Sequence, residues 1–380
     1  MEKLSVFGII HKFRKPIVVS LVIWSLFVPV VDGIIVQRDR NRNMLYGELF
    51  WSRGFGVYDL TDEDLNNTIP NVPEDHLLTD VLNVTYEYPI ITLMFFAGIA
   101  LIEPGVYGPH YLANWILILV SHMSMVFFVY LSQDYWNKKW YRQIFGAYYC
   151  FGLFLTVGFA KIEPFVDLLF LISIYFLREK KYVQANILLG LAFQTKLYPA
   201  YAYPFFFLSN PTASIAFLLT AGSLTLPLIF AGVSNESLVA HLLNSSSYSD
   251  IITNPFYIGW IFENPLSILA PLTLFIAFLY CVLETKRWRG IPIIQPKFRI
   301  QEPMAVLLYL IPLGLVFLSW VLIWYYAWFI TAILLFEREV NAEKYRYILI
   351  GFVAAHIVGV IVNPGYFLTG PLEELLSHFK

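Results

Sequence analysis

Long apolar runs separated by short polar segments recur along the whole chain. Examples are Ile17 to Val36, Tyr111 to Leu131, Ile144 to Ala160 and Ala213 to Gly232. As helices, runs of this kind are long enough to cross a hydrocarbon core of about 30 Å. Because lipid cannot satisfy exposed backbone groups, helices are the expected form of such segments. The pattern therefore predicts an all-α, polytopic integral membrane protein with about eleven spans.

Charged residues between the runs indicate an orientation. Lys3, Lys12, Arg14 and Lys15 precede the first span, and cytoplasmic flanks collect Lys and Arg, so the N-terminus is expected inside. Residues 37–110 then form a large first external loop with juxtamembrane helices. The apolar run in this loop that ends at Ile102 is short for a full crossing and predicts a half-inserted or surface-lying helix. The apolar runs Ile144 to Ala160 and Phe165 to Leu177 predict a hairpin whose tip, Lys161 to Pro164, lies outside. A polar segment without Lys or Arg, residues 233–264, predicts a second external loop.

Composition agrees with a membrane protein and points away from other classes. Of 380 residues, 58% are hydrophobic and only 14% are charged, which is outside the range of soluble proteins. One membrane domain over residues 1–380 is expected. The net charge of -2 gives no reason to expect nucleic acid. The two cysteines, Cys150 and Cys281, lie in apolar runs and predict no disulfide framework.

One segment combines membrane character with a charge and a break. It reads Leu-Leu-Gly-Leu-Ala-Phe-Gln-Thr-Lys-Leu-Tyr-Pro from residue 188, with Lys196 three positions before Pro199. A charge at membrane depth requires an anionic partner or a water-filled cavity. A proline there frees backbone groups that lipid cannot satisfy. The chain is expected to turn at this break, and Lys196 is either a phosphate-binding residue or a lysine that extends to the outer interface.

The stretch from Gly190 to Pro199, with Tyr201 and Pro204 after it, resembles a motif of GPI mannosyltransferase 1 catalytic subunits and of glycosyltransferase family 87. Both are GT-C enzymes. The resemblance implies a GT-C fold and a membrane glycosyltransferase that moves a hexose, with mannose expected. The implied donor is a polyprenyl- or dolichyl-phosphate sugar, and the implied acceptor is a lipid- or glycan-linked hydroxyl on the external or luminal face. The plasma membrane of a prokaryote and the endoplasmic reticulum are the implied locations.

The resemblance also implies where the site residues lie. Sugar transfer needs a carboxylate to deprotonate the acceptor and cations to hold the departing phosphate. In GT-C enzymes the acid lies in the first external loop, directly after the first span, where this chain has Asp39. Glu48 is the second candidate for the base and Asp32 the third. Asp39 and its neighbouring arginines could instead form an ordinary solvated turn. Lys196, Arg40 and Arg42 are the expected phosphate contacts.

Further positions match the same enzymes or suggest chemistry of their own. Tyr88, in Tyr-Glu-Tyr-Pro, and Tyr198 are expected at the substrate site, and Tyr198 and Tyr201 could form its wall. Asp250 and Asn254 in the second external loop are expected to contact donor or acceptor. The acidic run from Asp59 to Asp64 could bind a divalent cation, although no cofactor is expected. No His or Cys spacing predicts a metal site.

Two other functions fit a polytopic protein. A transporter for a polar solute could line its path with Lys196, Glu163 and Asp167. Secondary transporters often contain inverted repeats with paired broken helices, and the break at Lys196 has no counterpart elsewhere in the sequence. A non-catalytic assembly subunit is the third possibility, and it would tolerate the loss of Asp39 and Lys196.

Overall fold

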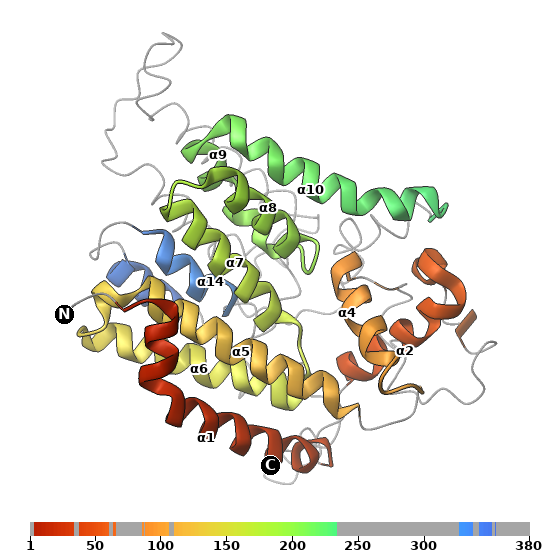
Figure 1. Ribbon diagram of the computed structural model, residues 1–380, viewed down its shortest axis with the longest axis horizontal. Coiled ribbons are helices and arrows are strands. Elements are labelled where there is room, and N and C mark those ends of the chain that lie inside the picture. The colour runs from red at the N-terminus through yellow and green to blue at the C-terminus, as the bar shows by residue number, and fades with distance from the viewer. Residues whose placement is uncertain are drawn as a thin grey trace, which may run out of the picture.

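The computed structural model describes residues 4–33, 38–60, 64–65, 86, 88–105, 110–233, 327–336, 342–351 and 354. Within these residues every regular element is a helix, as the sequence predicts (Figure 1). Three helices are long and apolar enough to cross a membrane, namely α1 (Val6–Asp32), α5 (Tyr111–Leu131) and α10 (Pro211–Phe230). The count of about eleven spans stays a prediction.

Helix α1 lies on the outside of the molecule, along α5 (Figure 1). It begins at Val6, where the Ser5 hydroxyl caps it by accepting a hydrogen bond from the Gly8 amide at 3.1 Å. The helix therefore begins well before Ile17, where the sequence places the start of the first span. Lys12 and the basic residues after it favour helix, and they extend the element toward the N-terminus instead of forming a separate flank.

The centre of the fold is built by α5, α6 (Lys139–Phe159) and α7 (Glu163–Arg178). Phe128 of α5 stacks on Tyr148 of α6 with ring centroids 4.9 Å apart, and both are buried. Gly152 of α6 faces α5 so closely that a methyl group there would meet the Ser121 hydroxyl at 2.9 Å. These contacts fix the position of α7, which carries the acids of the site.

The predicted hairpin between α6 and α7 is confirmed. The two helices are joined by a short turn, residues 160–162. Ala160 ends α6 with φ of 44°, a left-handed conformation that is unusual for a residue other than glycine. The amide of Lys161 then donates to the carbonyl of Leu155 at 3.0 Å, as in helix-terminating motifs. The turn is therefore tightly specified.

The predicted loop of residues 37–110 contains helices that pack on the rest of the protein. They are α2 (Arg38–Arg53), the 3-10 helix η1 (Gly54–Asp59) and α4 (Ile90–Ala100). Helices α2 and α4 touch at Gly47, where a Cβ atom would lie 2.7 Å from the Phe96 carbonyl carbon. Helix α4 is as short as its sequence predicts, and its depth in the membrane stays a prediction.

The predicted break at Lys196 is confirmed. Helix α8 (Tyr182–Phe193) ends just before it, and η4 (Tyr198–Ala202) and the short α9 (Tyr203–Ser209) lead to α10. A Cβ on Gly190 would meet Thr220 of α10, and farther along α8 the Gln194 amide donates to the carbonyl of Ala221 and the hydroxyl of Thr225. A later residue of the first helix contacts later residues of the second, so α8 and α10 run in the same direction. The chain between them therefore doubles back.

Helix α4 is anchored to the same break. The Ile91 amide donates to the Gln194 carbonyl at 3.0 Å, and the Thr92 hydroxyl donates to the Thr195 carbonyl at 2.5 Å. These carbonyls are released where α8 ends, and such groups need partners when they are buried. The first turn of α4 supplies those partners. The loop helices and the broken helix therefore meet, and Lys196 lies at this junction.

Candidate functional site

The N-terminal end of α7 supplies two buried carboxylates, Glu163 in its first turn and Asp167 one turn later. Glu163 and Asp167 are four positions apart, which places both on one face of the helix. Glu163 is 1% exposed and Asp167 is 6% exposed. A carboxylate in the first turn of a helix is stabilised by the helix dipole. That contribution is modest, so these buried acids also need partners from other elements.

Lysines supply part of that compensation. Lys196, from the break after α8, places its ammonium 2.7 Å from Glu163 Oε1. Lys161, in the turn before α7, forms an ion pair with Oδ2 of Asp39, in the first turn of α2. Glu163 interacts electrostatically with both lysines. Four charges from α2, the α6–α7 turn, α7 and the break thus form one connected group, which we call the charged row: Asp39, Lys161, Glu163 and Lys196.

Tyr88 borders the charged row just before α4. The Lys196 ammonium lies 5.3 Å from the centroid of its ring, and the Arg42 guanidinium lies 5.6 Å from the same centroid. Both distances are within the range of cation–π attraction. The Tyr88 carbonyl accepts a hydrogen bond from the Tyr58 hydroxyl at 2.9 Å, which fixes the residue. Arg42 of α2 and Lys196 therefore both lie beside the Tyr88 ring.

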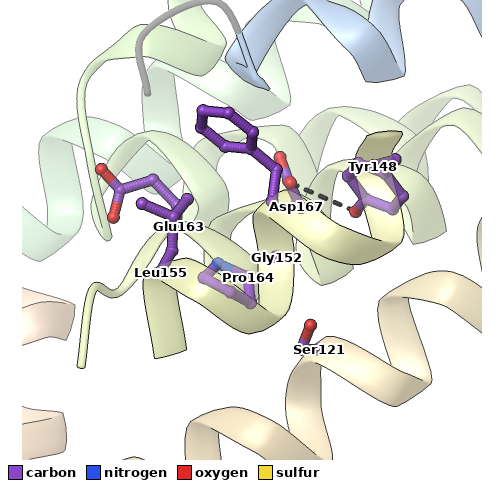
Figure 2. Close-up of a pocket in the computed structure, with 8 residues that line it drawn as sticks. Ser121, Tyr148, Gly152, Leu155, Glu163, Pro164 and Asp167 are labelled. Carbon is purple, nitrogen blue, oxygen red and sulfur yellow. Dashed lines mark hydrogen bonds between the residues drawn. The ribbon is translucent and has the colours of Figure 1, made fainter. Parts of the chain in front are cut away.

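Asp167, one turn after Glu163, accepts hydrogen bonds from two tyrosines. The Tyr198 hydroxyl donates to Oδ1 at 2.9 Å and the Tyr148 hydroxyl donates to Oδ2 at 3.2 Å. A small recess lies beside them, lined also by Glu163 and Ser121. Figure 2 shows Asp167 directed toward Tyr148 and the Glu163 carboxylate directed away from that tyrosine. The two acids of α7 thus have different partners.

Burial changes the protonation of Lys161. It lowers the pKa of this lysine to about 7, while Glu163 raises the pKa and Lys196 lowers it further. Lysine ordinarily loses its proton near pH 10.4. Lys161 can therefore lose its proton close to neutral pH, and the charges of Glu163 and Lys196 influence the pH at which it does so.

These residues lie largely within a segment that matches a known family. The model of glycosyltransferase family 87 matches residues 86–283, which is more than half of the chain. The chain belongs to glycosyltransferase family 87. This is a GT-C-type family, so the protein is a membrane glycosyltransferase that acts on a sugar donor and an acceptor. No curated protein and no solved structure matches the chain.

The two leading candidates for the base lie on different sides of α2 in this family 87 enzyme. Asp39 belongs to the charged row. Glu48 is nine positions later, and at 3.6 residues per turn this is the opposite side of the helix. Its Oε2 accepts a hydrogen bond from the Gly105 amide at 3.3 Å, beyond the end of α4. Glu48 therefore borders a loop and not the row.

Arg40 and Asp32 are joined to each other. The Arg40 guanidinium lies 2.7 Å from Asp32 Oδ1 at the end of α1, and it also donates to Asn114 Oδ1 of α5 at 3.2 Å. Arg40 is 2% exposed. It thus ties α2 to α1 and α5. The solvated turn that we considered for this part of the chain is wrong, because the arginines that follow Asp39 are buried in a helix.

Other expected residues are placed less centrally. Tyr201 packs its ring against Phe170 and Phe329, as a wall residue would. Asp250 and Asn254 lie outside the described residues, as do Asp62 and Glu63 of the acidic run from Asp59 to Asp64. Within the described part of the chain, no group of three or more His, Cys, Asp or Glu residues could hold a metal ion.

Sequence reasoning assigned no role to Lys161 or Tyr148. Lys161 was seen only as part of a hairpin tip, and Tyr148 as one aromatic residue among many in an apolar run. A signal for Lys161 did exist. It stands at the boundary of two apolar runs, two positions before Glu163, and in a membrane protein such a pair of opposite charges needs further partners. Tyr148 carried no comparable signal.

Proposed function

We propose that this family 87 enzyme transfers a hexose, namely mannose, from a polyprenyl- or dolichyl-phosphate donor to a lipid- or glycan-linked hydroxyl at the external or luminal face. Asp39 acts as the general base. Lys196 and Arg42, beside Tyr88, hold the donor phosphate. The proposal extends the family assignment to a donor, a sugar and named residues.

The reaction needs opposite charges at neighbouring positions. The acceptor hydroxyl attacks the anomeric carbon and gives its proton to the base. The bond from that carbon to the phosphate oxygen breaks, and the oxygen leaves with the electron pair. Negative charge on the phosphate increases in this step, so nearby cations stabilise the transition state more than the ground state.

One observation carries the proposal. Asp39 and Lys196 are far apart in the sequence, yet the charged row connects them through Lys161 and Glu163. Acids and lysines in apolar surroundings are expensive unless they are paired, and they are typical of functional sites in membrane proteins. A base and phosphate-binding cations are thus available within one group of residues.

The test is transfer of radiolabelled sugar from polyprenyl-phosphate mannose by the purified enzyme, with polyprenyl-phosphate glucose as the competing donor. We expect mannose transfer, and we expect Asp39→Asn to lower the rate by about 100-fold or more, because loss of a general base has an effect of that size. Glu48→Gln, on the other side of α2, is the matched control. Full activity in Asp39→Asn would remove Asp39 from this role. Preference for glucose would overturn the assignment of mannose, and failure with every lipid-phosphate donor would overturn the assignment of the donor class.

A further inference from the structure

Lys161 is held in place by its backbone. The residue before it, Ala160, has φ of 44°, and the Lys161 amide is bonded to the carbonyl of Leu155. A left-handed alanine is strained, and strain of this kind persists where the surrounding structure fixes it. Lys161 is 7% exposed. It is therefore a positioned lysine of the protein interior.

When Lys161 is protonated, the charged row is electrically balanced before a substrate enters. Asp39 and Glu163 are the acids, and Lys161 and Lys196 are the cations. The phosphate of a lipid-linked sugar brings one further negative charge, and it gains a second as the sugar leaves. A cation of the row must then turn partly from a carboxylate to the phosphate.

The two ion pairs differ in how easily a lysine can leave. In the pair of Lys196 and Glu163 the acid side chain is 2% exposed, whereas in the pair of Lys161 and Asp39 the acid is 24% exposed. Removing the partner of a fully buried charge is strongly unfavourable. Water can solvate Asp39 once its lysine moves. Lys161 is therefore the cation that can be exchanged.

We propose that Lys161 is an exchangeable counter-ion, which pairs with Asp39 before the donor binds and turns to the donor phosphate afterwards, so that the Asp39 carboxylate is free to accept the proton of the acceptor hydroxyl. The inference rests on the proposed function. Donor binding thereby activates the base, and the enzyme avoids exposing an active carboxylate without a donor. Lys161 contacts the leaving phosphate, whose new negative charge it stabilises.

The charge of Lys161 is sensitive to pH. The groups that face it are Asp39 on α2, Glu163 on α7 and Lys196 beyond α8. Burial lowers its pKa most, Glu163 raises the pKa and Lys196 lowers it, and the result is about 7. Only the protonated ammonium can hold a phosphate, so the contribution is present below this pKa and is lost as the pH rises through it. An arginine keeps its charge throughout this range.

The experiment measures the KM for polyprenyl-phosphate mannose and the pH dependence of kcat/KM in three enzymes: wild type, Lys161→Met and Lys161→Arg. We expect Lys161→Met to raise the KM about 10- to 100-fold, the loss typical of a hydrogen bond to a charged group. We expect Lys161→Arg to retain donor binding and to shift the fall in kcat/KM from about pH 7 to alkaline pH. Lys139→Met, an exposed lysine at the other end of α6, is the matched control.

A purely structural role for Lys161 would not shift the pH profile in the arginine variant. The inference is overturned if Lys161→Met binds donor as wild type does, or if Lys161→Arg keeps the wild-type fall near neutral pH. If Lys161→Met fails to fold, the arginine variant alone decides. Wild-type inactivity with every lipid-phosphate sugar would instead overturn the proposed function, and this inference with it, which is a distinguishable result.

Discussion

The two ion pairs of the charged row are built alike and differ in their surroundings. In each, an acid in the first turn of a helix binds a lysine from a turn, Glu163 with Lys196 and Asp39 with Lys161. The side chain of Glu163 is 2% exposed and that of Asp39 is 24% exposed. The acid is therefore closed to water in one pair and partly exposed in the other, whereas the lysines differ in the opposite sense, with Lys196 17% and Lys161 9% exposed.

This difference separates two roles that a buried ion pair can have. A pair whose acid is closed to water holds its elements in place, because opening it leaves an uncompensated carboxylate. Lys196 is therefore expected to meet the donor phosphate while it stays paired with Glu163. A pair with a partly solvated acid can open at lower cost and take part in chemistry. The closed pair joins α7 to the break after α8, and the accessible pair joins α2 to the turn before α7. Four predictions test this contrast, from the largest expected effect to the smallest.

Removing the lysine of the closed pair should have the largest effect on stability. Lys196→Met leaves the Glu163 carboxylate buried without its nearest cation, and we expect the free energy of unfolding to fall by about 3 kcal/mol or more. Thermal unfolding in detergent is the measurement. Lys161→Met, which exposes the more solvated Asp39, is the comparison and should lose clearly less. The double variant Lys196→Met with Glu163→Gln should recover part of the loss, and equal losses in both single variants would contradict the contrast.

Asp39 of the accessible pair lies on α2. A change that displaces α2 should therefore disturb the pair of Asp39 and Lys161 more than the pair of Glu163 and Lys196. In Gly47→Ala the new methyl group would lie 2.7 Å from the Phe96 carbonyl carbon of α4, a backbone atom that cannot turn away. We expect a loss of about 1–3 kcal/mol, typical of overpacking, together with lower transfer activity. Measured unfolding and transfer rates check both.

Gly98→Ala in α4 is the control for that change, since a methyl group there meets no atom within 4 Å. Alanine favours helix over glycine by about 1 kcal/mol, so the control should be neutral or slightly stabilising. Equal damage by the two alanines would show that α2 is not held by its contact with α4.

The sequence was informative where a local pattern determines structure. The break near Pro199 and the hairpin with its tip at Lys161 were both predicted, because a proline and paired charges interrupt an apolar run in only a few ways. The start of α1 was missed because helix propensity extends past the apolar region. The burial of Arg40 was also missed, because its partners Asp32 and Asn114 belong to other helices.

The site was harder to predict than the elements that carry it. Asp39 and Lys196 were predicted to belong to one site, but no periodicity reveals that Lys161 and Glu163 connect them. Such contacts depend on how α2, α7 and the break pack together, which is a tertiary property. Asp39 also precedes the segment that matches family 87, residues 86–283, whereas the other members of the row lie inside it.

Each tyrosine that binds Asp167 should contribute a moderate amount. Tyr148→Phe and Tyr198→Phe each remove one hydrogen bond from a buried carboxylate, at 3.2 Å and 2.9 Å respectively. We expect a loss of about 1–3 kcal/mol in the free energy of unfolding for each, the usual range for a buried group that loses a charged partner. The shorter bond should give the larger loss. Combined variants should be non-additive, because both hydroxyls bind one carboxylate.

Glu48→Gln should have the smallest effect, although Glu48 was the second candidate for the base. Its carboxylate accepts one long hydrogen bond from the Gly105 amide, and glutamine can still accept that bond through its side-chain oxygen. We expect a change below about 1 kcal/mol in the free energy of unfolding and a transfer rate near that of wild type. The informative quantity is the ratio of transfer rates of Glu48→Gln and Asp39→Asn, measured with one donor preparation. A ratio near one would remove Asp39 from the role of base, and a ratio below one would move the base to Glu48 on the far side of α2. In either case the accessible pair would lose its proposed role.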